Sequence, residues 1–172
     1  MVCTLFVQTA RVSGGFMILN PTWEYVSDQV MGGVSDGALS VTSQEGQAVA
    51  RLTGRVSLEN NGGFVQMAFD VASDGAVLDA SPWAGLEITL RGNGEIYDIR
   101  LRTAQLARPW QSFRAQVTAS PSWQDARLPF EAFEAHRTDS AFDPATLRRI
   151  GILAIGKVFD ADISVAQVRL FR

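Results

Sequence analysis

Residues 85–102 read GLEITLRGNGEIYDIRLR. Apolar residues occupy every second position in Leu86–Leu90 and again in Tyr97–Leu101, with polar residues between them. This period of two is typical of strands that face a core on one side and solvent on the other. Glycine and asparagine both tolerate positive φ, so the turn at Gly92–Gly94 predicts a hairpin between the two strands.

The same period recurs along the rest of the chain. It is clear over Val65–Val71. Shorter apolar or alternating runs predict further strands over Ala48–Leu52, Ser112–Val117, Trp123–Leu128 and Gly151–Ile155. In Ile163–Phe171 the apolar phase switches between Val165 and Val168, which predicts a β-bulge near Ala166 and Gln167.

Helical signals are few. Asp143 and Pro144 supply an N-cap and a first-turn proline, so a short helix is expected through Ala145–Arg149. A single turn is expected at Phe130–Phe133. About eight to ten short strands with so little helix predict an all-β fold, a β-sandwich or jelly roll, rather than βαβ units.

Length and composition predict one globular domain. The chain has 172 residues, of which 47% are hydrophobic and 19% charged. Its 15 Lys and Arg against 18 Asp and Glu give a formal charge of −3, so the basic balance of a nucleic-acid binder is missing. The single cysteine, Cys3, excludes an internal disulfide and a multi-cysteine metal site.

The sequence shows no targeting or membrane signal. No apolar run reaches the ~20 residues that cross a bilayer, so no membrane span is expected. Met1–Gln8 is apolar but lacks a charged start, and no clear small-residue cleavage site follows it. We expect a cytoplasmic protein with a single β-sandwich domain over residues 17–172, and residues 1–16 as an N-terminal extension or a first strand.

Residues 23–37, WEYVSDQVMGGVSDG, combine aromatic, acidic and glycine residues at unusual density. Two interpretations are open. As a binding loop, the segment offers a stacking aromatic, carboxylates and a Gly-Gly backbone that a ligand can approach closely. As a structural loop, its glycines serve turns, Asp28 and Ser35 bond local backbone, and Trp23 and Met31 fill one end of the sandwich.

A second candidate surface is the outward face of the strand at 97–102. Asp98, Arg100 and Arg102 would line up there, with Arg114 and Gln116 beside them. These side chains predict either ordinary cross-strand ion pairs or the polar floor of a groove in which arginine forks hold a partner's carboxylates.

Two other features would complete such a groove. Aromatic side chains that anchor ligands or partner proteins would form its walls. The candidate walls are Trp83, Trp110 and Phe113. The turn Asn60–Gly63 is a candidate rim, and its alternative role is to end one strand and begin the next.

No motif predicts catalysis. His136 is expected to lie in a polar loop, away from an evident nucleophile, as a solvated surface residue. The partners of a Ser-His-Asp triad converge only in space, so such a triad stays open but unsupported. The glycine-rich segments lack phosphate-loop and dinucleotide patterns, and no cofactor is expected. No metal ligand is assigned, although a loop Ca²⁺ site stays open.

Residues 23–37 resemble the opening signature of the complex I intermediate-associated protein family. Further similar blocks follow in the family's order, and they are Leu52–Phe64 (LTGRVSLENNGGF), Gly85–Arg102, Trp123, Leu128–Phe133 and Ile150–Ile152. The resemblance runs from Trp23 to Arg172 and suggests a compact bacterial-type member. It implies a galactose-binding-domain-like jelly-roll β-sandwich.

The resemblance also implies a function. Mitochondrial members of the family are assembly factors for respiratory NADH:ubiquinone oxidoreductase and act as binding proteins rather than enzymes. We therefore expect a non-enzymatic, chaperone-like domain whose partner is a protein, such as a respiratory-complex subunit. Its contacts would come from Asp28–Gly37, Asn60–Phe64 and the Arg100/Arg102 face.

The alternative is a carbohydrate- or small-ligand-binding module that uses the same face. The candidate contact residues under both hypotheses are Trp23, Asp28, Met31, Gly32, Gly33, Ser35, Asn61, Gly62, Gly63, Trp83, Asp98, Arg100, Arg102, Trp110 and Phe113.

Overall fold

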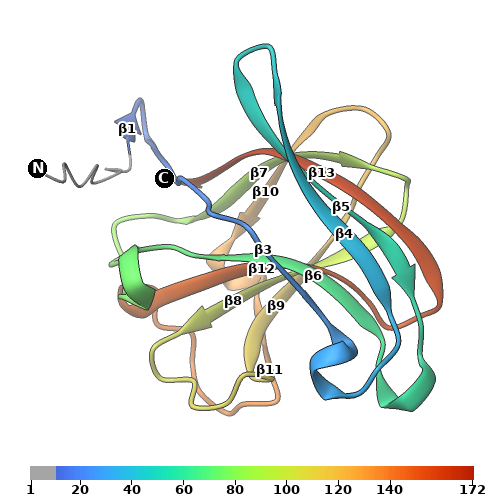
Figure 1. Cartoon of the computed structure of the whole chain (residues 1–172). Helices are drawn as coiled ribbons and strands as arrows, with labels where there is room; N and C mark the ends of the chain where they lie inside the picture. Colours follow the sequence, from blue (N-terminus) through green and yellow to red (C-terminus); the bar gives the residue numbers. More distant parts are fainter. Residues whose placement is uncertain (1–10) are drawn as a thin grey trace, which may run out of the picture.

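The alternating strands form two antiparallel sheets that pack face to face (Figure 1), in a computed structural model that describes residues 11–172. The seven-stranded sheet contains β1 (Arg11–Ser13), β2 (Phe16–Ile18), β4 (Asp36–Gln44), β5 (Gln47–Val56), β7 (Gly85–Gly92), β10 (Gln124–Pro129) and β13 (Phe159–Phe171). The six-stranded sheet contains β3 (Glu24–Ser27), β6 (Phe64–Asp70), β8 (Ile96–Thr103), β9 (Ser112–Thr118), β11 (Glu134–His136) and β12 (Leu147–Ile155). The all-β sandwich is therefore confirmed.

Helical structure in residues 11–172 consists of short 3₁₀ turns between strands. They are η1 (Asp28–Met31), η2 (Glu59–Asn61), η3 (Ser73–Gly75), η4 (Phe130–Ala132) and η5 (Pro144–Thr146). The single turn expected near residue 130 is thus present as η4.

The long strand β13 organises the seven-stranded sheet. β7 runs along one edge of β13, while β5 and β2 share the other edge. The register with β7 shifts between Val165 and Gln167, which leaves Ala166 as the extra residue of a bulge. Val165 and Val168 both face the core as a result, at 2% and 1% exposure. The bulge predicted from the phase switch is confirmed.

The turn Gly92–Gly94 does not form the predicted hairpin. β7 pairs with β10 and β13, whereas β8 pairs with β9 and β12, so the turn carries the chain from one sheet to the other. The N–H of Gly92 donates to the carbonyl of Ser120 at 2.8 Å, and that of Gly94 to Ala119 at 2.7 Å. A period of two reports which side chains face the core but not which strand is the neighbour.

The helix predicted over Ala145–Arg149 is also wrong. Asp143 caps the segment as expected, because its side chain accepts the N–H of Ala145 at 3.0 Å. The helical part ends with η5, and Leu147 begins β12. β12 lies between β6 and β8 in the middle of its sheet, so strand pairing outweighs the weak preference of one helical turn.

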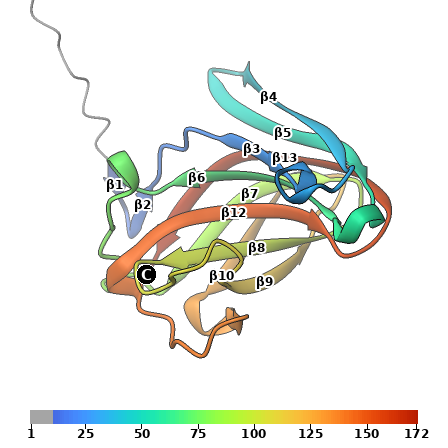
Figure 2. The ribbon, with the colours of Figure 1, turned by 60° about the horizontal axis from the view of Figure 1, so that its bottom comes forward.

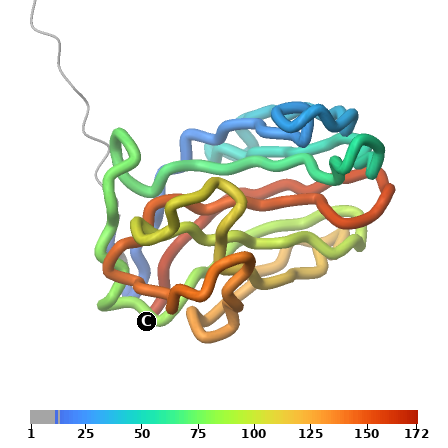
Figure 3. Tube along the Cα trace, turned by 90° about the horizontal axis from the view of Figure 1, so that it is seen from below, coloured from blue at the N-terminus to red at the C-terminus, as the bar shows by residue number. Residues whose placement is uncertain are grey.

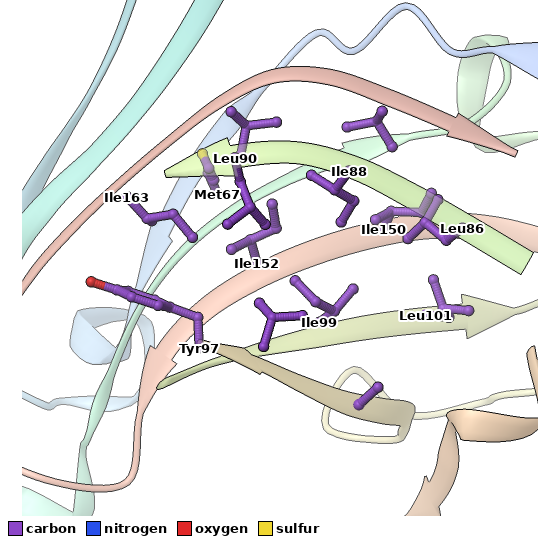
Figure 4. Close-up of a cluster of buried hydrophobic side chains, with 14 of the residues drawn as sticks. Met67, Leu86, Ile88, Leu90, Tyr97, Ile99, Leu101, Ile150, Ile152 and Ile163 are labelled. Carbon is purple, nitrogen blue, oxygen red and sulfur yellow. The ribbon is translucent and has the colours of Figure 1, made fainter. Parts of the chain in front are cut away.

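The inward faces of the two sheets form one core (Figure 4). Its fully buried side chains come from both sheets and include Met67, Leu86, Ile88, Leu90, Tyr97, Ile99, Leu101, Ile150, Ile152 and Ile163. The inward alternation predicted for β7 and β8 is thus confirmed. The Tyr97 hydroxyl donates to Oδ1 of Asn93 at 2.7 Å and accepts the N–H of Asp162 at 2.9 Å. Burial raises the pKa of Tyr97 to about 12.

The first described residues belong to the seven-stranded sheet. β1 pairs with β2, and β2 pairs with the end of β13. The boundary expected between residues 16 and 17 therefore falls inside β2. Residues 1–10 of the expected extension, including Cys3, lie outside the described residues. Among residues 11–172, no helix is long and apolar enough to span a membrane.

Candidate functional site

Asp28 joins two loops at one end of the sandwich. Its side chain is fully buried at the start of η1. Oδ1 accepts the N–H of Ser35 at 2.9 Å, and Oδ2 accepts those of Gly63 and Phe64 at 2.6 and 3.2 Å. The hydroxyl of Ser35 also donates to Oδ2. One carboxylate thus holds both the first loop, residues 28–35, and the second loop, residues 57–63.

These hydrogen bonds keep Asp28 charged in spite of its burial. Burial alone raises the pKa of a carboxyl group, but the bonds from Ser35, Gly63 and Phe64 outweigh it and hold the pKa of Asp28 below its ordinary value. Bonds to a charged acceptor are stronger than neutral ones. Asp28 and Ser35 are both 0% exposed, so their side chains position the loops and do not touch a partner.

Glycines let the two loops close around this carboxylate. A Cβ on Gly33 would lie 2.4 Å from Cγ of Asp28, and one on Gly62 would lie 2.5 Å from Oδ2. No side chain fits at such distances. Gly32 adopts φ +86° and ends η1, a left-handed conformation that costs glycine little. Packing against Asp28 thus explains Gly33 and Gly62, and the backbone conformation explains Gly32.

Apolar side chains gather on the outside of the same loops. Five of them are 44% to 76% exposed, and we call them the loop-end patch: Val30, Met31, Val34, Leu58 and Val158. Val158 belongs to the turn between β12 and β13, whose Gly156 N–H donates to the carbonyl of Gly63 at 3.2 Å. Figures 2 and 3 show η1, η2 and this turn together at one end of the sandwich. Exposed apolar clusters of this kind mark interaction sites.

The structure separates Trp23 from Met31. Trp23 is half-buried and packs edge-on against Phe69, with ring centroids 4.8 Å apart. Met31 is 62% exposed, so the expectation that it fills the end of the sandwich is wrong. The reason is that η1 is one short turn in which Asp28 alone is buried. Asp28 points inward, and the residues at the end of the turn point to solvent.

The outward face of the six-stranded sheet carries the expected polar group around Asp98. Its Oδ2 accepts hydrogen bonds from Nε and Nη2 of Arg100 at 3.0 and 2.6 Å. Its Oδ1 accepts a hydrogen bond from Nε2 of Gln116 at 3.0 Å. Nε of Arg114 lies 3.9 Å from Oδ2. Arg100 also donates to Oγ of Ser112 at 3.2 Å. The group is largely satisfied by itself, but its two-bond ion pair lies within β8 rather than across strands, and β9 contributes the bond from Gln116 and the longer contact from Arg114.

Arg102 holds a loop instead of joining this network. Its Nε donates to the carbonyl of Gln111 at 3.2 Å, and Nη2 donates to that of Arg108 at 3.0 Å. Burial lowers the pKa of Arg102, and the charges of Arg148 and Arg149 lower it further. Arg102 thereby orders the loop between β8 and β9.

A family model described as Complex I intermediate-associated protein 30 (CIA30) matches residues 18–165. The chain belongs to this family. The matched range contains both loops held by Asp28 and the Asp98 group, so the resemblance drawn from the sequence blocks is confirmed. A comparison with the curated proteins found no match.

Solved structures similar to this CIA30-family chain include carbohydrate-binding modules. One is a family 11 module from Clostridium thermocellum, in complex with a β-1,3-1,4-mixed-linked tetrasaccharide. Its TM-score is 0.71 at 14% sequence identity, and the alignment covers 93% of this chain and 97% of the module. The family 30 module of a cellulosomal cellulase of the same organism has a TM-score of 0.68 at 14% identity, covering 90% and 96%. At such identity the likeness shows the fold alone, a jelly-roll sandwich.

One of the three expected aromatic walls lies at the surface of this CIA30-family sandwich. Trp110 is 55% exposed, and the guanidinium carbon of Arg108 lies 5.8 Å from its ring centroid. Trp83 and Phe113 are 7% and 1% exposed, so neither lines a groove. Phe113 points inward on β9 and packs against Phe142 at 5.2 Å. The expectation of aromatic walls at these two positions is therefore wrong.

His136 lies in β11 rather than in a polar loop. It is half-buried opposite Ser112 of β9. Burial lowers the pKa of His136, and the nearby charges of Arg100 and Arg114 lower it further. Among residues 11–172, no group of three or more His, Cys, Asp or Glu is placed to hold a metal ion.

Sequence reasoning missed most of the loop-end patch, namely Val30, Val34, Leu58 and Val158. A signal for these residues was present. Each is an apolar side chain within two residues of a glycine, aspartate or asparagine, outside the runs with a period of two that were singled out as strands. Such a residue has no strand face on which to reach a core, so exposure at a loop end is a natural outcome.

Proposed function

We propose that this chain is a non-enzymatic binding domain that holds a protein partner through the loop-end patch. In this proposal it acts as an assembly factor, and the partner is a subunit or intermediate of NADH:ubiquinone oxidoreductase, the complex I of the family's description. The observation that carries the proposal is the gathering of five exposed apolar side chains on loops held by one buried carboxylate.

The patch suits protein binding for two physical reasons. Burying its side chains against a partner is favourable by about 25 cal/mol per Å² of apolar surface. Because Asp28 already holds both loops, little conformational entropy remains to be lost when a partner docks. The unbranched, polarisable Met31 side chain adapts to partners of different shape.

The outward face of the six-stranded sheet extends this surface. Phe64 of β6 pairs with Ile155 of β12 next to the loops, and both are half-buried. Two residues further along β12, Leu153 pairs with Asp98 of β8, and both are buried, at 6% and 2% exposure. The side chain of Arg114, which lies beside Asp98, is 40% exposed. On this face a partner would therefore touch Phe64, Ile155 and Arg114.

The test is affinity purification from the native source with three forms of the chain. The wild-type chain should retain subunits of NADH:ubiquinone oxidoreductase. The triple variant Val30→Ser/Met31→Ser/Leu58→Ser should retain at least about tenfold less, since each truncation removes apolar contact area. Arg100 and Arg102 are left unchanged, because their bonds hold Asp98 and a loop.

The matched control is Val41→Ser/Val77→Ser, which removes two valines that are 58% and 49% exposed outside the patch. This variant should retain the same subunits as the wild type. Equal recovery by the triple variant and the control would refute the proposal, provided that both unfold at the wild-type temperature. Wild-type chain that retains no such subunit would refute it as well.

Carbohydrate binding on the outward face of the six-stranded sheet is the second candidate. The observation that favours it is Trp110, an exposed ring beside Arg108. The outward positions of β8 and β9 carry no aromatic ring for stacking. Titration with the mixed-linked β-glucan tetrasaccharide, with Trp110→Ala as the variant, tests this candidate. Saturable, salt-insensitive binding that the variant loses would support it, and absence of wild-type binding would exclude this ligand.

A further inference from the structure

A polar cavity lies on the outward face of the seven-stranded sheet, where neither proposed function places a contact. Its volume is about 420 Å³, and its lining residues come from β4, β5, β13 and β7, with Pro121 from the turn before β10. Figure 1 shows where these four strands lie in the fold. The lining side chains used below are Ser40, Thr42, Ser164, Arg51, Arg91 and Asp162.

Cross-strand register places two arginines on either side of a small residue. Arg51 of β5 and Arg91 of β7 both pair with Ser164 of β13. Neighbouring strands lie about 4.8 Å apart, so the backbones of the two arginines stand roughly 10 Å apart. Ser164 is small and 8% exposed. It forms a low floor between two long side chains, which is why a cavity exists here.

The two arginines differ in how their charge is matched. Arg51 makes a two-bond ion pair with Asp162, with Nε to Oδ1 at 2.9 Å and Nη2 to Oδ2 at 2.8 Å. Among the described residues, Arg91 has no carboxylate partner. Its guanidinium carbon lies 4.6 Å from the ring centroid of Trp123. The lining therefore has one positive charge in excess, carried by Arg91.

We propose that this cavity binds a small ligand with one acidic group on a hydroxyl-bearing body, such as a sugar acid or a sugar phosphate. Arg91 takes the acidic group, because a guanidinium fork matches carboxylate and phosphate oxygens. The hydroxyls of Ser40, Thr42 and Ser164 exchange hydrogen bonds with the hydroxyls of the ligand. The ring of Trp123 supports the guanidinium through a cation–π contact. This site does not depend on the loop-end patch.

The test is calorimetric titration of the whole chain with D-glucuronate and with D-glucose 6-phosphate, using D-glucose and inorganic phosphate as reference ligands. At least one of the two acids should bind at least about tenfold more tightly than either reference. The acid that binds identifies carboxylate or phosphate as the preferred group. Failure of both acids to bind at millimolar concentration, or binding no tighter than either reference, would overturn the proposal.

Variants locate the site. Arg91→Gln should weaken binding of the acid at least about tenfold, because it removes the unmatched charge and the fork. Arg55→Gln is the matched control, since Arg55 lies on the same face of β5, pairs with Asp160 at 3.2 Å and is outside the cavity lining. Arg55→Gln should bind like the wild type. Equal weakening by both variants, or none by Arg91→Gln, would refute the assignment.

Tryptophan fluorescence gives a second readout. Binding at Arg91 should change the emission of Trp123, because the guanidinium lies over that ring. In Trp123→Phe the emission change should disappear while calorimetry still detects binding, since phenylalanine keeps an aromatic face for the guanidinium. An emission change that persists in Trp123→Phe would place the ligand elsewhere and overturn the assignment.

Discussion

Asp28 is the residue on which the geometry of both loops depends. Four hydrogen bonds from three residues converge on its carboxylate. They come from Ser35 in the first loop, from Gly63 at the end of the second loop and from Phe64, the first residue of β6. A substitution here therefore moves the loop-end patch without removing any of its apolar side chains. That separates the effect of loop position from the effect of contact area.

At this scale we predict that Asp28→Asn lowers the free energy of unfolding by about 2–3 kcal/mol. The amide keeps one oxygen acceptor but turns its NH₂ group toward N–H donors that have lost their partner. Urea denaturation measures the change. Asp36→Asn, at an exposed position in β4, is the control and should stay within about 0.5 kcal/mol of the wild type. A fully stable Asp28→Asn would show that the loops close without the carboxylate.

The pH dependence follows from the lowered pKa of Asp28, in which burial is outweighed by the bonds from Ser35, Gly63 and Phe64. As the pH falls through about 4, the unfolded chain takes up this proton before the folded chain does, so stability is lost. The difference in the free energy of unfolding between wild type and Asp28→Asn should therefore be largest at pH 7 and smaller near pH 3. Denaturation at both pH values measures the gap, and a constant gap would contradict this explanation.

At the scale of elements, the bulge at Ala166 keeps β13 in phase with the core. Val168 and Leu170 are 1% and 0% exposed beyond it. With strict alternation from Val165, these two side chains would face solvent and Arg169 would face the core. In the structure Arg169 points outward and pairs with Glu87.

Deletion of Val168, beyond the bulge, should therefore prevent folding. It keeps the extra residue Ala166 but moves the following residues by one position, so that Leu170 faces solvent and Arg169 faces the core. The loss of each apolar side chain from the core costs about 1.5–3 kcal/mol, and a charge is buried in addition. Circular dichroism and dispersion of amide proton shifts measure the loss. Ala166→Gly keeps the register and should cost about 1 kcal/mol or less. A Val168-deletion variant with wild-type stability would show that the phase of β13 beyond the bulge does not matter for folding.

At the scale of the whole molecule, the two sheets depend on each other. Consecutive strands such as β7 and β8 lie in different sheets, and both bury their apolar faces in the same core. Neither sheet retains a buried face when the other is lost. We therefore expect the sandwich to unfold as one cooperative unit.

Core truncations in either sheet test this expectation. Ile88→Ala in the seven-stranded sheet and Ile152→Ala in the six-stranded sheet should each lower the free energy of unfolding by about 2–5 kcal/mol. Both should shift one common transition in near-UV and far-UV circular dichroism. Two transitions, with only one of them moved by each variant, would mean that the sheets unfold separately.

The sequence alone determined the local features of this protein. The period of two in residues 85–102, the phase switch around Ala166 and the cap at Asp143 all depend on residues close together in the chain. The sequence blocks that resemble the family are local in the same sense. They predicted the jelly-roll class and the two contact segments, Asp28–Gly37 and Asn60–Phe64. These features follow from backbone preferences and from which side of a strand each residue occupies.

The tertiary structure alone decided what lies next to what. Asp28 meets Gly63 across 35 positions of sequence, and no local pattern connects them. The exposure of Met31, the burial of Trp83 and the cavity beside Arg91 likewise depend on how two sheets close over one core. The physical reason is that the apolar face of a strand can be buried against many alternative partners. Only the packing of the whole chain decides which partner it meets.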